Sequence, residues 1–231
     1  MLNKALGFKP DVFVPDMEDS VPTGEKENAR NLIAEYLPKL AESGVSIVPR
    51  VNSLDTKWAL DDLAAIVGPH IYGISIGKIN TPADIKIVSD HLSLFEQKAG
   101  LNEGHIKMIP WLESAKAIIH CHEICLASER LIGVAFGGED FTHDMGIERL
   151  EDESEVLFAR NQLCIAARAA EIPALDTPYF LFKNKEGLRT NSLIAKQCGF
   201  KGKFAIHPAQ IDEINNAFSP SKKEIEHAHR V

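Results

Sequence analysis

Residues 71–76 read IYGISI, and residues 81–84, which follow after a short gap, read TPAD. The first stretch is apolar without strict alternation, which is typical of a strand buried on both faces of a parallel sheet. The second stretch supplies a capping threonine, a proline at the first helical position and an acid in the first turn, so it predicts the start of a helix. A strand followed directly by a helix is the repeating unit of an α/β fold.

The same alternation recurs along the whole chain. Six further apolar runs predict strands at residues 11–15, 46–51, 106–112, 131–136, 172–176 and 202–206. Helical patterns are expected between them, at about residues 24–43, 55–67, 114–127, 154–170 and 187–198. Alternation of this kind predicts an α/β fold with a parallel sheet, and a (β/α)8 TIM barrel in which residues 1–231 form a single domain is one architecture of the right length. We expect the first strand of the barrel to be missing, because the pattern around Leu2 is already helical.

An open, doubly wound parallel sheet is the competing architecture for the same alternation. No G-x-G-x-x-G motif follows a predicted strand, so dinucleotide binding of the Rossmann type has no support in the sequence. The order of strands and helices alone leaves the choice between barrel and open sheet undecided.

Composition limits the classes of partner. The formal net charge is −8, which argues against a nucleic-acid partner held through its phosphates. No run approaches the roughly 20 apolar residues that span a bilayer, and no signal-peptide pattern is present, so a cytoplasmic or organelle-matrix location is expected. Cys121 and Cys125, flanked by His120 and His122, leave a thiolate–imidazole metal site open, although apolar packing is the simpler interpretation.

Candidate functional residues follow from one rule, since (β/α)8 enzymes place their chemistry at the C-terminal ends of the strands. The residues at the predicted strand ends are mostly acids with a few cations: Asp16, Glu18, Asp19, Arg50, Asn52, Lys78, Glu113, Gly137, Gly138, Glu139, Asp140, Asp176 and His207. Glu113 and Asp140 follow neighbouring strands and are the best pair for a hard divalent cation such as Mg²⁺. Alternatively, either acid caps the helix that follows it.

Other strand-end residues have two interpretations each. Arg50 has the planar guanidinium that binds a carboxylate of a 2-oxo acid, or it forms a salt bridge with Glu18 or Asp19 at the rim. Gly137 and Gly138 either present backbone amides to a ligand or form an ordinary tight turn. His207 either donates a hydrogen bond to substrate or ties the last strand to the rim.

Several of these segments resemble the citrate lyase beta-subunit-like family, the CoA-ester lyases of the HpcH/HpaI aldolase/citrate lyase superfamily. Residues 16–21 (DMEDSV), with Lys26 and Arg30 behind them, are similar to the family motif D-x-E-D-[AS]-V…K…A-R. Residues 50–52 (RVN), 112–114 (LES) and 136–141 (FGGEDF) match further family motifs in the same order. Residues 199–210 (GFKGKFAIHPAQ) form the most specific match, and the resemblance covers nearly the whole chain.

The resemblance implies a TIM barrel that carries Mg²⁺ on Glu113 and Asp140 and forms a homo-oligomer, a trimer or hexamer. It implies an enzyme that cleaves a citryl-, malyl- or citramalyl-thioester of CoA or acyl carrier protein and releases a 2-oxo acid. Arg50, Glu18 and Asp19 are then the expected catalytic residues. Arg50, Lys78, Gly137, Gly138, Glu139 and His207 are the expected substrate-binding residues.

The chain departs from the family pattern at both ends. No stretch matches the family's first strand, and the sequence stops soon after Pro220, where we expect the C-terminal lid to be truncated. Two alternatives to a thioester lyase therefore stay open. One is a metal-dependent aldolase for free 2-oxo acids, and the other is a non-catalytic barrel that binds a metabolite or serves as a subunit.

Overall fold

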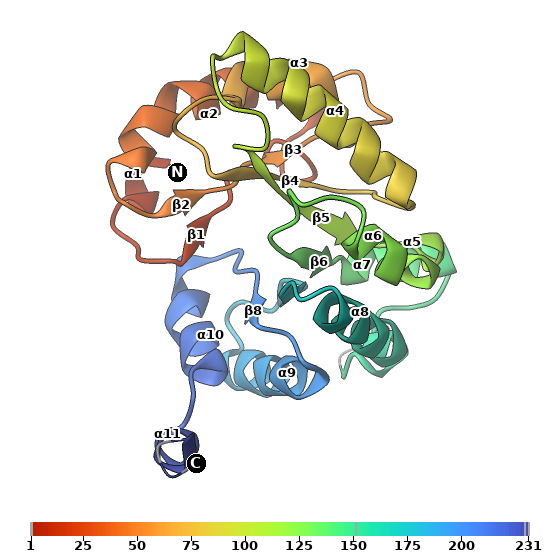
Figure 1. Ribbon diagram of the computed structural model, residues 1–231. Coiled ribbons are helices and arrows are strands. Elements are labelled where there is room, and N and C mark those ends of the chain that lie inside the picture. The colour runs from red at the N-terminus through yellow and green to blue at the C-terminus, as the bar shows by residue number, and fades with distance from the viewer. Residues whose placement is uncertain (1, 151, 229, 231) are drawn as a thin grey trace.

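A computed structural model describes residues 2–150, 152–228 and 230. Strands and helices alternate along nearly the whole chain (Figure 1). The strands are β1 (Val12–Phe13), β2 (Ser46–Ile47), β3 (Arg50–Val51), β4 (Gly73–Ile76), β5 (Lys107–Leu112), β6 (Val134–Phe136), β7 (Ala174–Asp176) and β8 (Gly202–Lys203). Each lies within one of the seven predicted runs.

The helices surround the strands on the outside (Figure 1). They are α1 (Leu2–Ala5), α2 (Lys26–Ala41), α3 (Ala59–Ile66), α4 (Pro82–Lys98), α5 (Ala115–Ile119), α6 (Cys121–Cys125), α7 (Gly138–Met145), α8 (Leu157–Ala169), α9 (Lys185–Cys198), α10 (Ile211–Phe218) and α11 (Lys222–Ala228). Three 3₁₀ turns, η1 (Thr23–Glu25), η2 (Ser154–Val156) and η3 (Pro208–Gln210), precede α2, α8 and α10. The capping threonine predicted at Thr81 is confirmed, and together with Asp84 it forms a capping box at the start of α4.

Every strand pair is parallel, and the strands follow one another in chain order from β3 to β8. β1 pairs with β2, and a further bridge between Asp16 and Arg50 continues that pairing to β3. β2 and β3 are therefore two parts of one strand, interrupted near Pro49, which lacks a backbone donor. Parallel strands in chain order with helices outside them confirm the predicted α/β barrel and exclude the doubly wound order.

Two layers of apolar side chains position the strand ends. A small inner cluster contains Val48, Ile109, Trp111 and Ala135, with Leu175 and Phe204 packed against it. A much larger cluster fills the space between the strands and the surrounding helices. Neighbouring strand residues alternate between the two, as a barrel requires, because successive side chains point to opposite faces.

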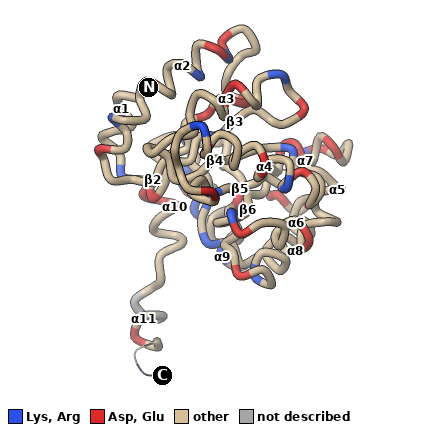
Figure 2. Tube along the Cα trace, turned by 45° about the horizontal axis from the view of Figure 1, so that its top comes forward, with Lys and Arg blue, Asp and Glu red and all other residues tan. Residues whose placement is uncertain are grey.

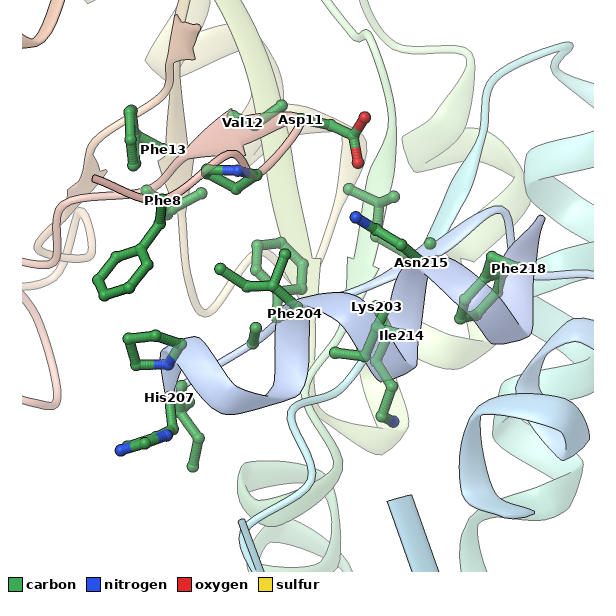
Figure 3. Close-up of a pocket in the computed structure, with 18 of the residues that line it drawn as sticks. Phe8, Asp11, Val12, Phe13, Lys203, Phe204, His207, Ile214, Asn215 and Phe218 are labelled. Carbon is green, nitrogen blue, oxygen red and sulfur yellow. The ribbon is translucent and has the colours of Figure 1, made fainter. Parts of the chain in front are cut away.

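A groove of about 480 Å³ separates the two ends of the strand order. Residues 11–14 around β1 line one wall and residues 201–208 around β8 line the other, with α10 beside them. Figure 3 shows Phe8, Val12 and Phe13 on the β1 side and Phe204, Ile214 and Phe218 on the β8 side. The groove is separate from the acid-rich strand ends.

Acidic and basic residues are interspersed along the trace, without one broad basic face (Figure 2). None of the helices in the described part of the chain has the length and apolar character to cross a membrane. Cys121 and Cys125 are buried without a disulfide, and burial raises the pKa of the Cys125 thiol to about 12. Both cysteines belong to the large apolar cluster, so apolar packing is the better account of them.

Candidate active site

The loop after β1 carries the first acids of the site and is fixed by buried donors. Lys26, on α2, donates from Nζ to the carbonyl oxygens of Met17 (3.0 Å) and Glu18 (2.7 Å). Asn52 donates from Nδ2 to the Met17 carbonyl at 2.9 Å. Because these donors come from two other segments of the barrel, the loop that bears Glu18 and Asp19 is held in one position over the strand ends.

Arg50 is the first residue of β3 and is held by Asp16. Its Nε and Nη2 donate to the two oxygens of that carboxylate at 2.7 and 2.5 Å. Its Nη1 lies 3.3 Å from Asp19 and 3.4 Å from Glu18. Burial works to lower the pKa of Arg50, but the hydrogen bonds and negative charge of Asp16 raise it instead, so the guanidinium stays charged. Asp16 therefore occupies Nε and Nη2 of the guanidinium, and Nη1 is the nitrogen that faces Glu18 and Asp19.

Glu18 is the most unusual acid of the site. Its residue is only 4% exposed, and neither carboxylate oxygen accepts a hydrogen bond. Lys78 Nζ lies 3.8 Å away, beyond hydrogen-bond distance. Burial raises the pKa of Glu18 to about 7, although Arg50 lowers it in part. A buried carboxylate without hydrogen bonds is costly, so its oxygens are suited to a ligand.

Glu113, at the end of β5, approaches Glu18 across Gly77. A Cβ at Gly77 would lie 2.9 Å from an oxygen of each carboxylate, so both acids pack against this glycine. The backbone N–H of Lys78 donates to Glu113 Oε1 at 2.6 Å, and Lys78 adopts a left-handed φ of 58° that few side chains tolerate. Burial first, and then the charge of Asp140, raises the pKa of Glu113 to about 8.

Asp140 lies in the first turn of α7, directly after β6. Gly137 precedes this turn, and a Cβ there would come within 2.3 Å of Glu113 Oε2, so only glycine lets Glu113 lie against the turn. The Gly138 amide donates to Thr177 Oγ1 at 3.2 Å, and the Glu139 carboxylate accepts from Arg149 Nε at 3.2 Å. Glu139 therefore turns toward Arg149, while the charge of Asp140 acts on Glu113 and Lys78.

The capping alternative for the two acids is not what the structure shows. Ser114 caps α5, where its Oγ accepts from the Ala117 N–H at 3.0 Å, and α7 has no side-chain cap. Asp144 Oδ2 accepts from the Ala115 N–H at 2.8 Å, which connects α7 to the segment that follows Glu113. Glu113 and Asp140 therefore do not cap these helices. The Asp144 contact and the close approach of Glu113 to Gly137 bring the two segments that carry them together.

These residues fit a magnesium ion through their donor chemistry. Over the described ranges, no group of three or more His, Cys, Asp or Glu side chains is arranged around a single metal position. Magnesium commonly takes only one or two carboxylates from the protein, with water and substrate as its other ligands. Glu113 and Asp140 repel each other, and the two oxygens of Glu18 beside them accept no hydrogen bond. A divalent cation would stabilise this group of negative charges.

His207 lies apart from the acids. It is the N-cap of η3, where Nδ1 accepts from the Ala209 N–H at 3.1 Å, and its ring stacks on Phe182 with centroids 4.8 Å apart. These contacts correspond to the interpretation of His207 as a residue that ties the last strand to the rim.

Sequence reasoning missed the floor of the site. Trp111 points into the barrel, donates from Nε1 to Ser75 Oγ at 2.6 Å, and lies beneath the guanidinium of Arg50 at 5.5 Å. Asp62, on α3, was also missed; its carboxylate accepts from Arg30 Nε at 2.8 Å and from Asn52 Nδ2 at 2.6 Å. The position of Trp111 inside the predicted strand 106–112 could have indicated its role. No local sequence feature indicates the role of Asp62.

A family model described as HpcH/HpaI aldolase/citrate lyase matches residues 1–208. The citrate lyase subunit beta of Haemophilus influenzae is 36% identical over 231 residues, which is all of this chain and 79% of the relative. The chain belongs to the HpcH/HpaI aldolase/citrate lyase family. Its membership makes it a carbon–carbon lyase and leaves the non-catalytic alternative without support.

Other relatives differ in activity. A (3S)-malyl-CoA thioesterase of Cereibacter sphaeroides is 34% identical over 231 residues, 99% of this chain and 76% of the relative. Among solved structures, the Haloferax volcanii malate synthase complex with magnesium and glyoxylate has a TM-score of 0.88 at 26% identity, covering 96% of this chain and 71% of that chain. The citrate lyase beta subunit from M. tuberculosis, complexed with oxaloacetate and magnesium, has a TM-score of 0.76 at 25% identity, covering 90% and 87%.

Proposed function

We propose that this lyase cleaves a 3-hydroxyacyl thioester of the citryl, malyl or citramalyl type into a 2-oxo acid and an acyl thioester, with magnesium as its cofactor. The observation that carries the proposal is the buried acid cluster at the strand ends, where the two oxygens of Glu18 accept no hydrogen bond beside Glu113 and Asp140. Relatives with known ligands support the substrate class, because the M. tuberculosis structure is described with oxaloacetate and magnesium.

Glu113 and Asp140 are the residues that would hold the magnesium ion. The Lys78 amide occupies Glu113 Oε1, so Oε2 is the oxygen that remains for a ligand. When bound, the ion would supply positive charge beside the substrate hydroxyl oxygen, which becomes negative as it loses its proton and before the carbon–carbon bond breaks.

Arg50 and the α7 turn are proposed to orient the oxo-acid half. Arg50 Nη1 faces the site and would donate to the substrate carboxylate, while Asp16 keeps the guanidinium plane fixed. The amides at the start of α7 lie at the positive end of a helix, which favours an anionic group there. We assign Gly137, Gly138 and Glu139 to this part of the pocket, with the Gly138 amide already shared with Thr177.

Glu18 is proposed to accept the proton of the substrate hydroxyl. Loss of that proton forms the new carbonyl as the adjacent carbon–carbon bond breaks, and the electron pair of that bond leaves on the acyl thioester as an enolate. The enolate carbon then takes up a proton to give the acyl thioester. Asp19 and Lys78 flank Glu18, and the ammonium of Lys78, 3.8 Å from Glu18, would help to orient an anionic substrate.

Self-association is also proposed, as a trimer or hexamer. Phe158 and Ile165 on α8 are 76% and 71% exposed, and Ile119 on the adjacent α5 is 69% exposed. Apolar side chains grouped in this way commonly form an interface between subunits. Light scattering of the wild type and of Phe158→Glu tests this, since a monomeric wild type contradicts the assembly.

The direct test is to incubate the protein with citryl-, malyl- and citramalyl-CoA and to measure both possible products. Release of oxaloacetate, glyoxylate or pyruvate that depends on magnesium and stops with EDTA is the expected result. Release of the free hydroxy acid with CoA indicates thioester hydrolysis, the activity named for the Cereibacter sphaeroides relative. Turnover of free 2-oxo-3-deoxy acids alone would instead establish an aldolase without a thioester requirement.

A further inference from the structure

We infer that Arg149 is a positioning residue for the first turn of α7, and that it acts through a line of alternating charges that is buried at one end and reaches the half-exposed Glu139 at the other. The line runs Asp176–Arg160–Glu153–Arg149–Glu139 and is called the charge line below. It links the end of β7 to the helix turn that carries Asp140. The inference rests on the proposed function, because it concerns the helix turn that presents a proposed magnesium ligand.

Arg149 makes a contact with each of its three guanidinium nitrogens. Nε donates to Glu139 at 3.2 Å, Nη2 donates to Glu153 at 2.7 Å, and Nη1 donates to Glu155. The side chain is 19% exposed. Since all three nitrogens are engaged by protein carboxylates, Arg149 is placed to hold neighbouring segments together.

The side chain of Arg149 lies beside the N-terminus of α7, the helix that precedes it in the chain. α7 ends at Gly146, whose left-handed φ of 66° reverses the chain. The Arg149 guanidinium then lies against Gly138, where a Cβ would be 3.2 Å from Nη2. A cation beside a helix N-terminus is electrostatically unfavourable for that helix. A favourable interaction with the helix dipole therefore does not account for Arg149. Its effect on the turn comes through Glu139, and Glu153 and Glu155 hold it in place.

The other end of the charge line is anchored in the sheet. Arg160, only 1% exposed, donates from Nη1 to Glu153 at 3.1 Å, and from Nε and Nη2 to the two oxygens of Asp176 at 3.1 and 2.9 Å. Lys203, the neighbour of Asp176 across the β7–β8 pair, donates to the same carboxylate at 2.5 Å. Glu153 adopts a left-handed φ of 56°, a conformation that persists only where surrounding contacts enforce it.

A matched control exists elsewhere in the fold. Arg130 is also a buried arginine, and its Nη1 and Nη2 donate to the two oxygens of Glu96 at 2.7 and 2.8 Å. Its other partners are two serines of α4 and the Ile106 carbonyl, so it does not reach α7. Arg130→Met removes a buried arginine of the same type without touching the charge line.

The experiment compares Arg149→Met, Arg160→Met and Arg130→Met in the full chain. Amide hydrogen exchange is followed at Phe141 and Thr142 in metal-free protein, and the magnesium dissociation constant is measured by calorimetry. We expect faster exchange in α7 and magnesium binding weakened about 10- to 100-fold in the two charge-line variants. Arg149→Lys, which keeps the charge but not the three-way geometry, should give intermediate values. Arg130→Met should leave both readouts at the wild-type level even if it lowers the melting temperature.

Unchanged α7 exchange in Arg149→Met, or an equal increase in Arg130→Met, overturns the inference. If Arg149→Met does not fold, Glu139→Gln removes only the last contact of the charge line and gives the same comparison. A wild type that binds no magnesium contradicts the proposed metal site, while the exchange comparison still decides the role of Arg149.

Discussion

Two sets of buried carboxylates in this molecule have opposite surroundings. Glu96 is fully buried, yet both oxygens accept from Arg130, and the Ile106 and Gly104 amides donate to them at 2.6 and 3.0 Å. Burial would raise the pKa of Glu96, but these hydrogen bonds lower it. Glu18 and Glu113 are also buried, and their pKa values are raised to about 7 and about 8.

The difference separates stability from function. Every oxygen of Glu96 has a partner within the chain, so this acid contributes to the folded structure and offers nothing to a ligand. Glu18 has no hydrogen bond and Glu113 faces another acid, so the contacts with Arg50 and with the Lys78 amide do not offset the burial of these two charges. Natural proteins tolerate such local costs mainly at functional sites, which is why this comparison supports the strand ends as the active site.

The largest expected effect is on catalysis. Asp140→Asn or Glu113→Gln should lower magnesium-dependent kcat/KM roughly a thousandfold, because the transition-state charge loses a stabilisation of several kcal/mol. The fold should remain, since each change removes one of two repelling charges. Steady-state kinetics with circular dichroism checks both points, and wild-type turnover in either variant would contradict the metal assignment.

The next effect distinguishes the two sets of acids by stability. Glu96→Gln leaves the Arg130 charge without its counter-ion, and we expect a loss of about 3 kcal/mol in the free energy of unfolding. Glu18→Gln should be neutral or stabilising, because it removes a buried charge without hydrogen bonds. Urea denaturation of both variants measures this, and a larger loss for Glu18→Gln would reverse our assignment of the two carboxylates.

A smaller effect concerns pH. Because the folded-state pKa values of Glu18 and Glu113 lie above their unfolded values, the folded state binds protons more tightly. In EDTA, the contribution of these two groups to the free energy of unfolding should be greatest below about pH 4.5 and should fall as the pH rises to about 8. Magnesium should oppose this loss at pH 8. If magnesium raises the melting temperature by the same amount at pH 5 and at pH 8, the proposed coupling between these carboxylates and magnesium is contradicted.

The smallest effect concerns His207. His207→Ala removes the η3 cap and the stacking on Phe182, and should cost about 1 kcal/mol of stability. If its role is structural, kcat/KM at saturating magnesium should be unchanged. A clear loss of kcat/KM in folded His207→Ala protein would restore the expectation that this histidine binds substrate.

The sequence by itself determined the fold class and most of the charged residues at the strand ends. Continuous apolar runs separated by helical patterns require strands covered on both faces, and parallel strands bring their C-terminal ends to one side. For that reason Glu18, Asp19, Arg50, Lys78, Glu113 and Asp140 could be named from their place at strand ends, and the structure brings them together.

Only the tertiary structure decided which group each of them contacts. Asp16 takes the bidentate edge of Arg50 across 34 residues, and the Lys78 amide holds Glu113 across 35. Glu139 turns toward Arg149 while Asp140, its neighbour on the same helix turn, acts on Glu113. Residue spacing cannot specify these choices, because they depend on how far each strand advances before its neighbour ends and on which side chains already hold the available hydrogen bonds.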